Sequence, residues 1–177
     1  MDQKTAKKLV EKGRAEGKSD QEIYNELSTD YASKKNLALL ITGTATTADR
    51  QKYKMLNNVL IALLGVTLAF RLIAAFYLIS SGEWATVFFL FLGMVLTGLV
   101  IYAVFNYMGA FYKPFGFLSA LSVVKTLIGS SGSMLELIDL ALLIPIPILC
   151  FYLGAKLFPN FKPNKLKKDV AGAYILN

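Results

Sequence analysis

The sequence contains no histidine and only one cysteine among its 177 residues. Without histidine, the chain lacks the side chain that most often acts as a general base near neutral pH and as a metal ligand. A single cysteine, Cys150, excludes any disulfide within the chain. Because Cys150 lies in an apolar run, we expect it to be a small buried hydrophobic residue.

Sequence motifs that mark enzymes are also missing. The chain contains no glycine-rich phosphate loop, nucleophile elbow, HExxH or CxxC motif. Ser119, Ser122 and Lys125 lie within about two helical turns, but nothing marks an oxyanion site beside them, so a Ser-Lys nucleophile is disfavoured. Glu136 and Asp139 supply only a pair of carboxylates, which does not define a cation site. We therefore expect a protein that is not an enzyme and that holds no metal and no cofactor.

Long hydrophobic runs dominate what is present. Hydrophobic residues make up 55% of the chain, against roughly 45–50% in soluble domains. Residues 56–80 form a nearly unbroken apolar run, long enough as a helix to cross a hydrocarbon core of about 30 Å. Residues 84–107 and 135–158 form two further runs of similar length. These runs predict an all-α, polytopic integral membrane protein.

A third apolar segment, about residues 112–129, is less regular. The dipeptide Lys113-Pro114 interrupts it and leaves about 15 apolar residues, which is roughly 22 Å of helix. Lys125 costs up to roughly 3 kcal/mol if it lies near the centre of the bilayer. An interfacial or re-entrant segment is therefore the alternative to a full span.

The positions of the basic residues decide between three spans and four. With four spans and a cytoplasmic N-terminus, all of the 19 Lys and Arg residues lie on the cytoplasmic side except Arg71 and Lys125, which lie inside spans. Three spans would place the C-terminal lysines outside, against the positive-inside rule. We therefore predict a four-helix transmembrane bundle in a cell membrane, the inner membrane if the source is bacterial, with both termini in the cytoplasm.

The predicted organisation has three parts. Residues 1–55 form a cytoplasmic helical tail, and residues 56–158 form the transmembrane bundle. Residues 159–177 form a basic cytoplasmic C-terminal tail that can contact anionic lipid. Acidic residues largely offset the basic ones in the first part, which argues against binding to nucleic acid.

The N-terminal tail carries recognisable helix starts. Ser19 and Glu22 have the spacing of a capping box, and Thr46 with Asp49 predicts a helix that runs directly into the first span. The helix that follows Ser19 has one apolar face, made of Ile23, Tyr24, Leu27 and Tyr31. This face has two interpretations: a cap that folds against the cytoplasmic ends of the spans, or a docking surface for a partner protein.

Ionisable residues inside the predicted spans are candidates for a functional site. They are Arg71, Lys125, Glu136 and Asp139. In the four-span topology all of them lie in the outer half of the membrane. We predict an ion pair between Lys125 and Asp139, with Arg71 reaching Glu136 or Asp139. The cluster either fixes the order of the helices or lines an ion or substrate pathway.

Proline and glycine positions add two expectations about the spans. Pro145 and Pro147 should disturb the last helix, because each removes a backbone donor and crowds the carbonyl four residues earlier. The disturbance is either a permanent kink or a source of free carbonyls for an ion. Gly65 and Gly93 each have a small residue four positions later, which predicts a close approach of the first two spans.

These features lead to an expected function. We expect a non-enzymatic integral membrane protein that acts by binding, of an accessory, assembly or immunity type, with recognition through the cytoplasmic tail or the lateral faces of the spans. The alternative is a small oligomeric transporter or channel that uses the buried charges near the outer side. The expected partners are the lipid bilayer and either another protein, cytoplasmic or membrane-embedded, or a second copy of this chain; no nucleic acid is expected.

Overall fold

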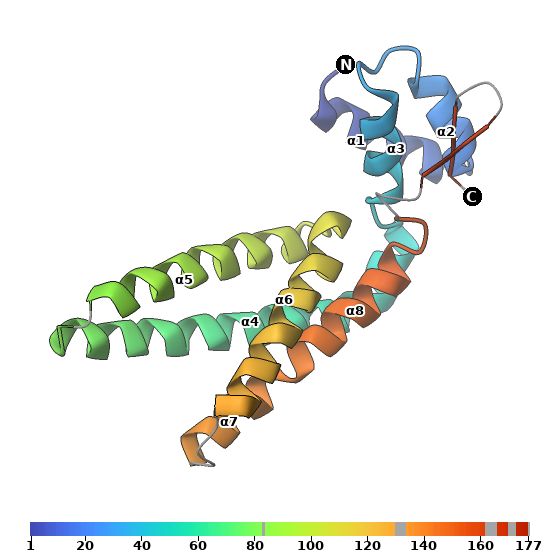
Figure 1. The fold of residues 1–177 in the computed structure, drawn as a ribbon. Helices are drawn as coiled ribbons and strands as arrows, with labels where there is room; N and C mark the ends of the chain where they lie inside the picture. Colours follow the sequence, from blue (N-terminus) through green and yellow to red (C-terminus); the bar gives the residue numbers. More distant parts are fainter. Residues whose placement is uncertain (83, 130–133, 162–165, 170–172, 177) are drawn as a thin grey trace.

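The fold is mostly helical (Figure 1). A computed structural model describes residues 1–82, 84–129, 134–161, 166–169 and 173–176, with the side chains of residues 134–136 excepted. Its helices are α1 (Gln3–Ala15), α2 (Asp20–Leu27), α3 (Lys34–Thr42), α4 (Thr47–Ser80), α5 (Trp84–Phe105), α6 (Gly109–Gly129), α7 (Met134–Leu143) and α8 (Pro145–Leu157). Two short strands, β1 (Lys167–Lys168) and β2 (Tyr174–Ile175), pair antiparallel.

Three of these helical segments are long and apolar enough to cross a membrane. They are α4, α5 and the segment Leu137–Leu157, which runs through α7 and α8. The predicted cap of α4 is confirmed, because the Thr46 hydroxyl accepts a hydrogen bond from the Asp49 backbone N–H at 3.1 Å. At 34 residues, α4 is longer than a span requires, and its first turns lie outside the apolar run.

Helix α6 begins earlier than the sequence predicts and runs through Pro114 without a break. The carbonyl that the proline ring crowds belongs to Ala110, in the first turn of α6, where the backbone is least constrained. The expected interruption at Lys113-Pro114 is therefore wrong. The uninterrupted helix has 21 residues, which is about 31 Å of helix.

A small domain contains both ends of the chain (Figure 1). It consists of α1, α2, α3 and the sheet, around a core made of Val10, Ile23, Tyr24, Leu37, Ala38, Ile41 and Leu176. The predicted capping box of α2 is confirmed: the Ser19 backbone N–H donates to the Glu22 carboxylate at 2.8 Å, and this bond lowers the pKa of Glu22. The C-terminal residues, predicted as a separate basic tail, are thus part of this domain.

A side chain of α2 binds the backbone of the C-terminal residues Tyr174 and Leu176. The Gln21 side chain donates to the Tyr174 carbonyl at 3.1 Å and accepts from the Leu176 N–H at 3.0 Å. The rings of Tyr24 and Tyr174 meet edge to face, with centroids 6.4 Å apart. Because these bonds pair backbone groups of one end of the chain with a side chain of the other, the two ends fold as one unit.

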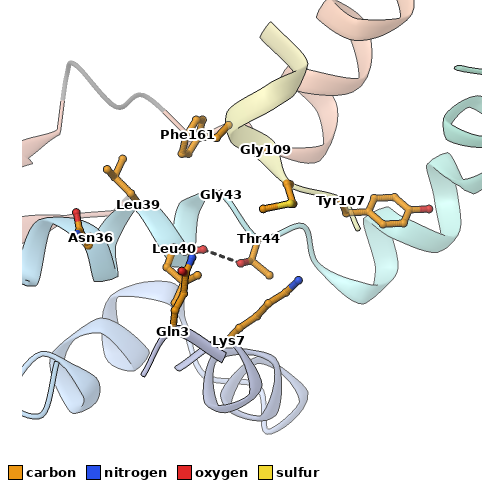
Figure 2. Close-up of a pocket in the computed structure, with 12 residues that line it drawn as sticks. Gln3, Lys7, Asn36, Leu39, Leu40, Gly43, Thr44, Tyr107, Gly109 and Phe161 are labelled. Carbon is orange, nitrogen blue, oxygen red and sulfur yellow. Dashed lines mark hydrogen bonds between the residues drawn. The ribbon is translucent and has the colours of Figure 1, made fainter. Parts of the chain in front are cut away.

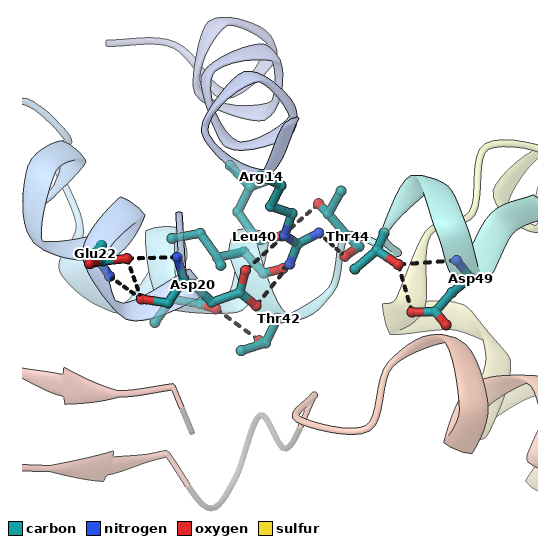
Figure 3. Close-up of polar contacts among 11 residues, drawn as sticks. Arg14, Asp20, Glu22, Leu40, Thr42, Thr44 and Asp49 are labelled. Carbon is teal, nitrogen blue, oxygen red and sulfur yellow. Dashed lines mark hydrogen bonds and ion pairs between the residues drawn. The ribbon is translucent and has the colours of Figure 1, made fainter. Parts of the chain in front are cut away.

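Arg14 joins α1 to α2, to the end of α3 and to the connection that precedes α4 (Figure 3). Its guanidinium binds the Asp20 carboxylate through Nε and Nη2, at 2.7 and 2.9 Å. It also donates to the carbonyls of Ile41 and Thr44, at 2.9 and 2.6 Å. The carbonyls at the end of a helix lack partners within the helix, so Arg14 caps α3 while it pairs with α2.

Helices α4 to α8 form two hairpins that leave the small domain in diverging directions (Figure 1). Helix α5 returns along α4, and α6 packs along α8, which in turn lies against α4 near the domain. Their common core contains Cys150, fully buried as predicted, and is completed by Leu60, Leu64, Val100, Val104, Tyr112, Ile146, Leu153 and Leu157.

Glycines allow the close approach of α6 and α8. A Cβ atom at Gly116 would lie 3.0 Å from the Cys150 Cβ, and one at Gly154 would lie 3.1 Å from the Tyr112 Cβ. At Gly65, in contrast, an added Cβ would meet no atom within 4 Å. The expectation that Gly65 serves a helix contact is therefore wrong, because that residue faces away from the other described helices.

Replacing Arg14 with glutamine should loosen the small domain, since it removes the ion pair with Asp20 and the cap on α3 together. We expect a loss of about 2 kcal/mol in the free energy of opening of α1–α3, measured by amide hydrogen exchange. Lys12→Gln is the matched control, because the Lys12–Glu16 pair on the same helix is exposed and should contribute less than about 0.5 kcal/mol. Equal effects of the two substitutions would contradict the role given to Arg14.

Candidate functional site

A cavity of about 380 Å³ lies between the two hairpins and brings Arg71 and Asp139 to one site. Its walls come from α4, α6 and α7, with polar and apolar side chains in similar numbers. The lining residues are Thr67, Phe70, Arg71, Ala74, Ser122, Thr126, Ile138, Asp139, Leu142 and Leu143. Opposite charges from different helices therefore face the same space.

Arg71 donates hydrogen bonds to two residues of α5. Its Nη1 donates to the Thr97 hydroxyl at 3.0 Å and to the Gly93 carbonyl at 3.2 Å. A Cβ at position 93 would lie 3.2 Å from Nη1, so Gly93 leaves room for the guanidinium. Thr97 is buried and donates its own proton to the Gly93 carbonyl at 2.8 Å. Neutral acceptors of α5 thus fix one side of the guanidinium.

Nε and Nη2 of Arg71 make no hydrogen bond with another described residue. A guanidinium carries five N–H donors, and the hydrogen bonds of Arg71 with other described residues all use Nη1. A second cavity of about 200 Å³ lies on the α5 side and shares Thr67, Arg71, Ser122 and Leu143 with the first. Arg71 is therefore half-buried at the boundary between two cavities.

The predicted ion pairs do not form among the described side chains. Lys125 and Asp139 are both exposed, and neither they nor Arg71 and Asp139 make an ion pair. Lys125 is turned by about 100° from Thr126 on the helix, so Thr126 lines the cavity and Lys125 does not. The side chain of Glu136 lies outside the described residues.

Pro145 and Pro147 lie just after Leu143, the last residue of the cavity wall along the chain. Helix α7 ends at Leu143 and α8 begins at Pro145, while Ile144 between them keeps helical dihedral angles. The Ile144 N–H still donates to the Leu140 carbonyl at 2.9 Å. Pro147 is buried among the neighbouring helices. The last apolar segment is thus split into two helices at the position where Pro145 and Pro147 were expected to disturb it. The split follows Leu143, a residue of the cavity wall.

A buried polar network joins α4, α5 and α6, and sequence analysis missed it. The Tyr112 hydroxyl donates to the Asn57 side-chain oxygen at 2.6 Å, and the Asn57 amide donates to the Val104 carbonyl at 3.2 Å. Asn57 and Tyr112 are 1% and 0% exposed. The available signal was an amide side chain at the start of an apolar run, since such groups bond across helices in membranes.

The predicted docking face is not open to a partner. Ile23 and Tyr24 are 2% and 1% exposed, and Leu27 and Tyr31 are half-buried beside them. α3 and the C-terminal residues around Leu176 cover this face. The docking interpretation is therefore wrong for Ile23 and Tyr24, whose partners lie too far along the chain for a local pattern to reveal them.

Another cavity, of about 300 Å³, lies where the small domain meets the turn between α5 and α6 (Figure 2). Gln3 and Lys7 of α1 lie on one side of it and Phe161 on the other, while Tyr107 lines it with its ring directed away (Figure 2). The Gly109 N–H donates to the Gly43 carbonyl at 3.2 Å across this junction. Lys7 is the one charged residue among the described residues that line this cavity, which lies between the domain and the helices that follow it.

Tyr112→Phe should weaken the polar network without changing the packing, because it removes only the hydroxyl. We expect the unfolding free energy in detergent to fall by about 1 kcal/mol, measured by denaturant unfolding followed by circular dichroism. Tyr102→Phe is the matched control, since Tyr102 is 65% exposed and should leave that free energy unchanged. A Tyr112→Phe protein as stable as the control would show that the network contributes nothing.

The cavity between the hairpins offers a ligand four groups that bind charge or form hydrogen bonds. They are the guanidinium of Arg71, the carboxylate of Asp139 and the hydroxyls of Ser122 and Thr126. No protein-family model, no curated protein and no solved structure matches this chain.

Proposed function

We propose that this chain is a four-span integral membrane protein with both termini in the cytoplasm, and that it acts by binding a ligand between its spans. The number of crossings must be even, because both ends of the chain meet in one small domain. Three segments have the length and hydropathy of a span. α6, with 21 residues, is the remaining helix of sufficient length and supports a count of four.

The orientation follows from charge. Every described Lys and Arg residue except Arg71 and Lys125 lies in the small domain or toward the end of a helix that adjoins it. Such an excess is typical of the cytoplasmic side of a membrane protein. Arg71 and Asp139 then lie in the outer half of the bilayer, on helices whose far ends point away from the cytoplasm.

Binding is assigned to the cavity between the hairpins. The observation that carries this proposal is that Arg71 and Asp139 face one cavity without pairing to each other. A charge placed in the bilayer costs about 2.5–3.5 kcal/mol on insertion scales, so ionisable residues inside spans are candidates for a functional site. No ion pair with another described residue neutralises Arg71 or Asp139. The apolar face of the cytoplasmic domain is already covered, which leaves the lateral faces of the spans for recognition.

The four-span topology predicts a labelling pattern. Cysteines placed at Ser81 and Gly129, the far ends of α4 and α6, should both react with an impermeant thiol reagent added outside intact cells. A cysteine at Asp30 should react only after the membrane is opened. Cys150 is fully buried and should give little background. Labelling of Ser81 and Gly129 positions from opposite sides would overturn the topology.

Binding in the cavity predicts a local response to ligand. A polarity-sensitive dye on Ile138→Cys, in the cavity wall, should change its emission saturably when the detergent-purified protein is titrated with a lipid extract of native membranes. The control is the same dye on Ile148→Cys of α8, which is 62% exposed and lies outside the cavity lining. No saturable change at position 138, or the same change at both positions, would refute binding in the cavity. If the dye signal instead saturates only with a water-soluble extract of the same cells, the result would favour the transporter alternative.

A further inference from the structure

Among the described residues, the cavity between the hairpins is lined by two charges of opposite sign. A ligand with one charge would satisfy Arg71 or Asp139 and leave the other facing it without a partner, and an unpaired charge in a low-dielectric site is costly. A ligand that carries both an anionic group and a cationic group satisfies both walls. The cavity is therefore complementary to a zwitterion.

The geometry of Arg71 favours phosphate as the anionic group. Thr97 and Gly93 occupy Nη1, which leaves the edge formed by Nε and Nη2 without a described partner. These N–H groups are parallel and match two oxygens of a phosphate in a bidentate contact. Since α5 fixes the opposite side of the guanidinium, this edge is already oriented when the ligand arrives.

The hydroxyls of the cavity favour an ammonium group that carries hydrogens. Thr67 donates its proton to the Leu63 carbonyl at 2.9 Å, and Thr126 donates to the Ser122 carbonyl at 3.0 Å. Each hydroxyl oxygen is then left only as an acceptor. Together with the Asp139 carboxylate, these oxygens can accept N–H donors, which a primary ammonium has and a quaternary ammonium lacks.

The size and setting of the cavity indicate where the ligand comes from. A volume of about 380 Å³ is at the low end for a small-molecule site and suits a headgroup rather than a whole lipid. Phe70, Ala74 and Ile138 of its wall are exposed on helices that we place among acyl chains. A ligand reaches this site from the lipid phase, with its chains remaining between the diverging hairpins.

We propose that the cavity binds the headgroup of an aminophospholipid of the phosphoethanolamine class, with the phosphate on Arg71 and the primary ammonium on Asp139. This assignment rests on the proposed function, since it names the ligand of the same cavity. It makes the protein a receptor for one zwitterionic lipid within the bilayer.

The test uses the full chain labelled at Ile138→Cys and three lipids with identical acyl chains. Phosphatidylethanolamine should bind about tenfold more tightly than phosphatidylcholine or phosphatidylglycerol, because only its headgroup offers both a phosphate and N–H donors at an ammonium. Asp139→Asn should remove this preference for phosphatidylethanolamine over phosphatidylglycerol. Arg71→Lys, which keeps the charge and loses the bidentate edge, should weaken binding of all three lipids.

Lys125→Gln is the matched control for the substitutions, since Lys125 is a charge at similar depth that does not line the cavity. It should leave all three affinities unchanged, and an effect equal to that of Asp139→Asn would overturn the assignment. Equal binding of the three lipids would overturn it as well, and so would full competition by free phosphoethanolamine. If the native lipid extract still saturates the signal at position 138 in that case, the proposed function stands and only the identity of the ligand fails.

Discussion

The attachment of the C-terminal residues to α2 is the constraint on which the rest of the structure depends. Gln21 and Tyr24 hold Tyr174 and Leu176 in the core of the small domain, so both ends of the chain are fixed at one end of the molecule. Arg14 then binds the end of α3 and the connection that leads to α4. The chain between Thr47 and Leu157 starts and ends at this domain, so its helices that lead away must be matched by helices that lead back. Hairpins are the simplest such arrangement.

The hairpins are joined tightly near the domain and diverge beyond it (Figure 1). Near the domain, the bond between Tyr112 and Asn57 and the contact of Gly154 with Tyr112 bring α4, α6 and α8 together. Farther from the domain, α4 and α5 run in one direction and α6, α7 and α8 in another (Figure 1). The cavity lies where the helices begin to separate, because packing no longer fills the space between α4, α6 and α7.

Arg71 and Asp139 have different surroundings in this fold. Arg71 takes neutral acceptors from α5, which anchors the guanidinium without neutralising it. Asp139 faces the same cavity from α7. A direct ion pair would have neutralised both charges and closed the space between them. Keeping them apart leaves an oriented pair of opposite charges, which is the basis of the proposed binding of a zwitterionic headgroup.

The sequence by itself determined the local features: the caps at Ser19 and Thr46, the apolar segments and the burial of Cys150. Caps and periodicity depend on residues within a few positions, so a single sequence carries them. Only the tertiary structure decided what the apolar face of α2 and the charges of the spans contact. Tyr24 meets Tyr174, and Arg71 meets Thr97 rather than Asp139. Such partners are chosen by how the helices pack, and residue type alone does not specify which of several acceptors at the same depth lies within reach.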